Sequence, residues 1–199
     1  MRAVRPHLLW RLVEAGDGAP DLPLVWSELA ASADASAAWR DAFTAATARY
    51  YGTPPPPSMP AAFVLQWCLE VPATLGAAGA LLGPWVLDPR TAGLSLAVEP
   101  SAAYPTTLQL RSAGEVVADP VRRLAAARDA YLDAGRQLAE AYHPGVNLGR
   151  HQRLSMVEDL WSMAVARLHG RGGSDPSLNE AGREQAAAAG RALAHLLGG

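Results

Sequence analysis

The residue that most clearly suggests chemistry is Glu70. It is the one charged residue between Ser58 and Leu87, and it shares a helix face with Gln66, four positions earlier, beside Trp67. A carboxylate buried alone in apolar surroundings is very costly in free energy, so it is paired, shifted in its pKa, or exposed at a pocket. We expect Glu70 to act as an acid/base group in a pocket lined by Gln66 and Trp67. The alternative is that a helix end at Pro72 brings Glu70 to the surface.

A second group of polar residues, Arg150, His151 and Arg153, comes shortly before Ser155. Ser155 and Glu158 have the spacing of a capping box, which predicts that a helix begins at Ser155. The free amides of a helix N-terminus favour an anion, and guanidinium groups bind carboxylate, phosphate or hydroxamate oxygens in pairs. We expect Arg150 and Arg153 to bind an anionic or chelating ligand, and His151 to serve as a second acid/base candidate. The alternative is a solvated basic loop.

Histidines raise the question of a metal or a haem. His143 and His151 flank one loop, but no pair of ligands with helical metal-site spacing occurs in the helices that we predict. We therefore assign no metal ligands. A haem- or metal-dependent enzyme that uses His143 and His151 stays open as an alternative.

The composition limits the classes of protein that fit. Of the 199 residues only one, Cys68, is cysteine, which excludes structural disulfides and a [2Fe–2S] cluster held by the cysteines of one chain. The formal net charge is −2, and residues 120–199 carry 10 Arg against 8 acids, without the concentrated basic stripe of a nucleic-acid binder. All 17 basic residues are arginine, which we interpret as the codon bias of a high-GC bacterial genome.

Helical spacing dominates the first half of the chain. Ser36 is a candidate N-cap for a helix with one buried stripe, formed by Trp39, Ala42, Phe43, Ala46 and Tyr50. Four prolines, 54–57, end that helix. Two helices, 59–70 and 72–83, follow with Glu70 as their one charge, and we place them at the centre of the fold.

The middle of the chain predicts a small antiparallel sheet. Alternating apolar residues at 94–98 and again at 107–111 flank a short connection, which is typical of a β-hairpin, and Val116 and Val117 extend it after a turn at Gly114. Asp119 and Pro120 then mark the start of a helix that ends at His143. Together these elements predict a mainly helical α+β domain with a small sheet in its middle.

We expect residues 1–199 to form one domain with a core at about 36–170. An N-terminal helix at 5–15 and a C-terminal helix at 177–197 complete it, the latter opened by a capping box at Ser177 and Glu180. The apolar run from Ser58 to Leu87 is the one candidate membrane segment. Pro72, three glycines and Glu70 favour buried helices of a soluble core instead, and we expect a cytoplasmic protein.

The order of elements from 39 to 170 resembles the ferric-iron reductases of FhuF type, which include siderophore-utilisation proteins. The resemblance lies in an aromatic-rich helix, a long uncharged helical pair with Phe63-Val64-Leu65-Gln66-Trp67, a hairpin, and a closing helix with Leu160-Trp161. That family holds a [2Fe–2S] cluster with cysteines near its C-terminus. Here a glycine-rich loop and an alanine-rich segment stand in that place. The resemblance therefore implies a scaffold without the cluster.

These observations lead to one main hypothesis of function. We expect a cluster-free FhuF-like protein that binds, and acts on if it is an enzyme, a bulky small molecule or metal chelate in a siderophore or natural-product pathway, with Trp161 among the ligand contacts. The open alternative from another class is a non-catalytic helical interaction module that forms a homodimer. That alternative predicts an exposed apolar patch on one of the helices.

Overall fold

The structure is a computed structural model of the whole chain, and it describes residues 10–14, 22–31, 33–112 and 114–168. The described part is a mainly helical domain with a small antiparallel sheet in the middle of the chain, as the sequence predicts. The helices are α1 (Trp26–Ala31), α2 (Ala33–Tyr51), α3 (Ser58–Leu82), α4 (Pro120–Ala141) and α5 (Arg150–Leu168). The strands are β1 (Arg11–Glu14), β2 (Leu24–Val25), β3 (Trp85–Val86), β4 (Ser95–Val98), β5 (Pro105–Leu110) and β6 (Glu115–Val116).

Helix α3 is the centre of the fold and is one helix, not the two that the sequence predicts. Pro72 lies inside it, where the missing backbone N–H leaves the carbonyl of Cys68 without its usual helical partner. The indole Nε1 of Trp26, in α1, donates a 2.7 Å hydrogen bond to that carbonyl. The helix therefore continues through Pro72 because a side chain from another helix replaces the lost donor.

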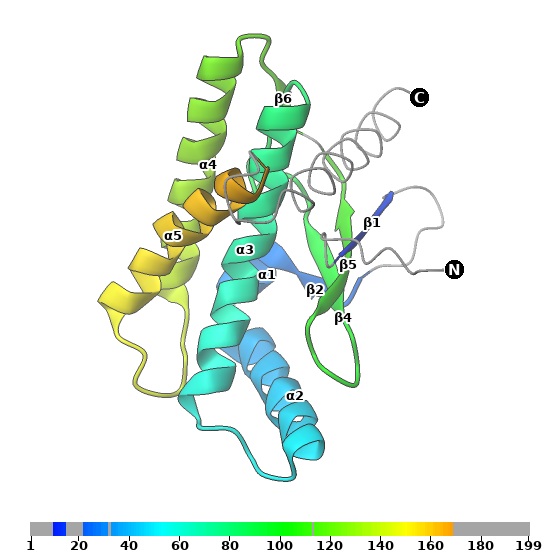
Figure 1. The fold of residues 1–199 in the computed structure, drawn as a ribbon, viewed down its shortest axis with the longest axis vertical. Coiled ribbons are helices and arrows are strands. Elements are labelled where there is room, and N and C mark those ends of the chain that lie inside the picture. The colour runs from blue at the N-terminus through cyan, green and yellow to red at the C-terminus, as the bar shows by residue number, and fades with distance from the viewer. Residues whose placement is uncertain (1–9, 15–21, 32, 113, 169–199) are drawn as a thin grey trace.

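Most of α3 is buried by the other elements. It packs against α2, α4 and α5, and Figure 1 shows α4 and α5 on one side of α3 and the four-stranded sheet on the other. The helix is long and apolar enough to cross a membrane, but 78% of its most apolar window is buried inside the protein. This burial is consistent with the core helix of a soluble protein.

The four-stranded sheet has the order β1-β5-β4-β2. The predicted hairpin is confirmed, because β4 and β5 are antiparallel with Leu96 opposite Leu108. Strand β1 pairs with β5 in parallel, so residues 11–14 are a strand and not the end of the predicted N-terminal helix. Strand β6 pairs with β3 instead of extending the hairpin, which corrects the expectation for Val116.

Helix α2 ends at Tyr51, before the prolines, as the sequence predicts, but it differs from its prediction at its start and in part of its buried stripe. It begins at Ala33, so Ser36 is an interior residue, and the hydroxyl of Ser36 accepts a 3.1 Å hydrogen bond from Arg40. Trp39, Phe43 and Ala46 are buried as the spacing predicts. Ala42 and Tyr50, however, are exposed, Tyr50 at 82%, so two of the five predicted stripe positions are not buried.

Helix α4 begins as the sequence predicts, and α5 does not. The carboxylate of Asp119 accepts a 2.7 Å hydrogen bond from the backbone N–H of Arg122, and Pro120 takes the first helical position. Helix α5 begins at Arg150, five residues before the predicted capping box. Ser155 is therefore inside the helix, and its hydroxyl donates to the carbonyl of Gln152 at 3.0 Å.

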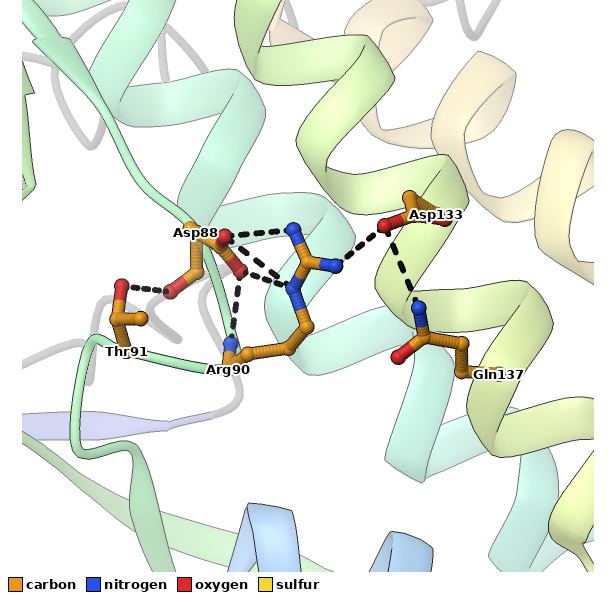
Figure 2. A network of polar contacts seen from close by, with 5 residues as sticks. All are labelled: Asp88, Arg90, Thr91, Asp133 and Gln137. Atoms are coloured by element: carbon orange, nitrogen blue, oxygen red, sulfur yellow. Dashed lines mark hydrogen bonds and ion pairs between the residues drawn. The ribbon is translucent and has the colours of Figure 1, made fainter.

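A network of charged groups fixes the loop after β3 to α4 (Figure 2). The guanidinium of Arg90 donates to both carboxylate oxygens of Asp88, including a 2.8 Å contact from Nη2, and bridges to Asp133 on α4. Gln137 donates to the same oxygen of Asp133 at 3.3 Å. The hydrogen bonds from Arg90 lower the pKa of Asp88.

The predicted helix at 177–197 and residues 5–9 of the predicted N-terminal helix lie outside the described residues.

Candidate functional site

Glu70 lies in the middle of α3 and is 8% exposed. Its position one turn after Gln66 places both side chains on one face, and Gln66 Nε2 donates to Glu70 Oε2 across 3.5 Å. The continuation of α3 through Pro72 keeps Glu70 away from any helix end. The alternative in which a helix end exposes Glu70 is therefore wrong.

The principal partner of Glu70 is Arg167, which comes from the last turn of α5. Arg167 Nη1 donates to Glu70 Oε1 and forms an ion pair with it. A cation is favoured in this position by the dipole at the C-terminus of α5. The side chain of Arg167 is 53% exposed, whereas the carboxylate is almost fully covered. The pair therefore presents a positively charged guanidinium outward, held from behind by a buried carboxylate.

Thr74 adds a further polar group to the same face of α3. It lies one turn after Glu70 and is buried. Among the residues that the structure describes, its hydroxyl Oγ1 has no hydrogen-bond partner. A buried hydroxyl without a partner is unfavourable by itself. The helix face that carries Glu70 therefore has a second polar group, one turn later, that is available to a ligand or a water molecule.

An aromatic pair supports the site from α4 and α5. Tyr131 and Trp161 stack with ring centroids 5.5 Å apart, and the Tyr131 hydroxyl donates to the carbonyl of Val157 at 3.1 Å. Burial raises the pKa of Tyr131, and the negative charge of Glu70 raises it further. Tyr131 is thus a neutral phenol close to the carboxylate. Trp161, which the sequence predicts as a ligand contact, is 5% exposed in this stack.

Trp67 belongs to the contact between α2 and α3. Its ring stacks on Trp39 at 5.9 Å and meets Phe43 edge-on at 5.4 Å. Phe63 lies tilted against it at 5.7 Å. Trp67 is half-buried in this cluster, so packing between the two helices accounts for its ring.

Arg150, His151 and Arg153 lie in the first turn of α5, not in a loop before a helix. Arg150 forms an ion pair with Glu140 on α4, and this contact raises the pKa of Arg150. Arg153 Nε donates to the carbonyl of Ala139 at 2.9 Å, and its Nη1 donates to that of Leu148 at 2.7 Å. Arg153 thus closes the C-terminal end of α4. His151 is exposed.

The two groups of predicted site residues lie at opposite ends of α5. Arg167, beside Glu70, comes 17 positions after Arg150 and 14 after Arg153 in one helix. At 1.5 Å per residue, these separations correspond to roughly 20–25 Å along the helix axis. A single small ligand does not reach both groups. The structure therefore brings Gln66 and Glu70 together, and separates them from Arg150, His151 and Arg153.

The side chains that could ligate a metal ion do not gather in the described part of the chain. Within residues 10–14, 22–31, 33–112 and 114–168, no group of three or more His, Cys, Asp or Glu side chains is arranged to hold a metal ion. His143 and His151 are both exposed. Cys68 is buried, and this burial raises the pKa of its thiol to about 12.

Comparison of the chain with protein-family models, with curated proteins and with solved structures finds no match. The chemistry of the site is therefore inferred from its geometry alone. Arg167 is the residue that sequence reasoning missed. It lies 97 positions from Glu70, and the one available signal was the isolated charge of Glu70, which requires a cation from elsewhere in the chain.

Proposed function

We propose that this chain binds an anionic small molecule at the face formed by Glu70, Gln66 and Arg167. The observation that carries the proposal is the half-exposed side chain of Arg167, whose guanidinium is paired with a buried carboxylate. Arginine has five N–H donors in a planar fork, and Glu70 accepts from one nitrogen of that fork. The donors on its other nitrogens suit the paired oxygens of a carboxylate, a phosphate, a hydroxamate or a catecholate.

Glu70 has a positioning role in this proposal. A carboxylate that already accepts from Arg167 and Gln66 holds these donors in place. Binding an anion to a pre-oriented guanidinium avoids the entropy cost of ordering a free arginine side chain. The unpartnered hydroxyl of Thr74 lies on the same face and supports the proposal of a polar site in this otherwise apolar helix.

The class of ligand that we propose is a bulky organic acid or metal chelate of the siderophore type. The support is the resemblance in the order of elements to the FhuF-type reductases, together with an arginine-based anion site. The chain has one cysteine, which is buried, so we propose binding or processing of the chelate without an iron–sulfur cluster. The proposal places this activity in the bacterial cytoplasm.

The test is a titration of the whole chain with an anionic ferric tris-catecholate complex, followed by intrinsic tryptophan fluorescence. Trp67 lies three positions from Glu70 on α3, within range of quenching by a bound ferric complex. The proposal predicts saturable quenching by the ferric complex. The gallium(III) complex of the same ligand is expected to compete for the site with equal affinity. Linear, non-saturable quenching by the ferric complex would contradict it.

A further inference from the structure

The end of α2 carries two exposed tyrosines next to a run of prolines. The apolar stripe of α2 is buried at Trp39, Phe43 and Ala46 and continues to Tyr50, which is 82% exposed. Tyr51 is 70% exposed, and the two rings meet edge-on at 4.8 Å. Both lie at the end of the molecule where α2 ends and α3 begins (Figure 1). The apolar side of α2 thus continues past its buried part, and the rings of Tyr50 and Tyr51 are exposed to solvent.

The loop that follows has a conformation fixed largely by its own residues. Each residue from Thr53 to Pro56 precedes a proline, which disfavours helical backbone and favours an extended or polyproline II form. Pro57 precedes Ser58 and adopts helical backbone, with φ −57° and ψ −27°. Hydrogen bonds from Gly52 N to Ala48 O and from Met59 N to Pro56 O, both 2.9 Å, anchor its two ends.

These features form what we call the tyrosine–proline surface, defined as Tyr50, Tyr51 and residues 54–57. Proline rings packed against exposed aromatic rings are the contact by which polyproline segments are recognised, because the preformed backbone loses little entropy on binding. This surface carries both halves of that contact, the aromatic rings and the prolines. In a contact with two-fold symmetry both copies use the same surface, so tyrosines of one copy and prolines of the other are available to each other.

Charge also permits two copies to meet at this surface. Residues 50–69 include no charged side chain, and the flanking charges are Arg49 and Glu70. The surface itself therefore carries no charge to repel its copy, and the adjacent Arg49 is exposed and donates to the carbonyl of Pro100 at 3.4 Å. Glu70 is itself covered and paired with Arg167.

We propose that the tyrosine–proline surface is a self-association site, at which Tyr50 and Tyr51 of one copy pack on residues 54–57 of a second copy. The surface is small, and interfaces that bury less than about 1,200 Å² in total form transient complexes. The expected product is a reversible dimer with a dissociation constant in the micromolar range. This inference is independent of the anion site at Arg167.

The test is sedimentation velocity of the whole chain over a series of concentrations across the micromolar range. The wild-type chain is expected to shift from monomer to dimer by mass action. The variant Tyr50→Ser with Tyr51→Ser, and separately Pro55→Ala with Pro56→Ala, are each expected to raise the dissociation constant by about tenfold or more. Because Tyr50 and Tyr51 are exposed, the serine variant is expected to keep the fold, which circular dichroism verifies.

The matched control is Val121→Ser, which removes an exposed apolar side chain at the start of α4. It is expected to dimerise like the wild type. A wild-type chain that stays monomeric at every concentration would overturn the proposal. Binding of residues 54–57 by a separate polyproline-binding domain would not rescue it. A dimer whose dissociation constant is unchanged in both the tyrosine and the proline variants would overturn it as well.

Discussion

At the scale of single residues, Trp26 compensates for the proline inside the central helix. Replacing Trp26 by Phe keeps a large ring but removes the N–H that donates to the Cys68 carbonyl. An unsatisfied buried carbonyl costs about 1–3 kcal/mol, so we expect the free energy of unfolding to fall by that amount. Urea denaturation monitored by circular dichroism measures it.

Pro72→Ala in the Trp26→Phe background supplies the control for this prediction. Alanine restores a backbone N–H at position 72, which reaches the same carbonyl through the normal helical hydrogen bond. We expect the second substitution to recover part of the lost stability, so that the two changes are non-additive in a double-mutant cycle. Strict additivity would show that the indole hydrogen bond does not replace the missing helical donor.

Cys68 gives the protein a predicted sensitivity to alkaline pH. Burial raises the pKa of this thiol from its ordinary value of 9.0 to about 12. The unfolded chain therefore loses the thiol proton at lower pH than the folded chain. The stabilisation is complete below pH 9 and is lost as the pH rises towards 12. The ordinary pKa is 9.0 for Cys68 and 10.0 for the buried tyrosines. Between pH 9.0 and pH 10.0 we expect Cys68 to lower the free energy of unfolding by about 1 kcal/mol.

The Cys68→Ala variant isolates this effect. It creates a small cavity and is less stable at every pH, but it has no thiol to titrate. Between pH 9.0 and 10.0 its free energy of unfolding is expected to fall by about 1 kcal/mol less than that of the wild type, because only the buried Tyr131 and Tyr142 contribute to its loss there. The measurement is urea denaturation across that interval. If wild type and variant lose stability equally there, the thiol is not the titrating group.

At the scale of the elements, arginines close the ends of helices. Arg123 donates from Nε to the carbonyl of Ala80, near the C-terminus of α3, at 2.7 Å, and from Nη1 to the carbonyls of Val117 and Ala118. Hydrogen bonds from a charged donor contribute about 1.5–3 kcal/mol. We expect Arg123→Met to lower the free energy of unfolding by about that amount in urea denaturation.

The neighbouring residue provides a matched control for Arg123. Arg122→Met changes the same side chain one position earlier, on an exposed part of α4, and is expected to alter stability by less than about 0.5 kcal/mol. Equal losses in the two variants would indicate a general effect of charge, and not the closure of α3 by Arg123.

Elements whose signals are local were predictable from the sequence. The cap at Asp119 and the alternation at 94–98 depend on neighbouring residues, and both predictions are confirmed. Elements that depend on distant partners were not. Helix α3 passes Pro72 because of Trp26, 46 positions earlier, and residues 11–14 form a strand because β5, nearly a hundred positions later, pairs with them. Ser155 satisfied a capping pattern inside a helix that starts at Arg150.

At the scale of the whole molecule, half of the candidate site was predictable. A lone charge in a long apolar helix identified Glu70, and helical spacing identified Gln66. The cation that completes the pair, Arg167, comes from the packing of α5 on α3, which local patterns do not contain. Arg167 lies in the last turn of α5, next to Glu70. Arg150 and Arg153 lie in the first turn of the same helix and are therefore far from Glu70.

The measurement that tests the central claim most directly compares two arginine variants in the ferric tris-catecholate titration. Arg167→Gln removes the guanidinium beside Glu70, and Arg150→Gln removes an exposed one at the far end of the same helix. Loss of a charge-assisted hydrogen bond of about 1.5–3 kcal/mol corresponds to roughly a tenfold to hundredfold weaker dissociation constant. The anion site at Arg167 predicts that weakening for Arg167→Gln, with circular dichroism unchanged, and wild-type affinity for Arg150→Gln. Unchanged affinity in a folded Arg167→Gln variant would contradict it.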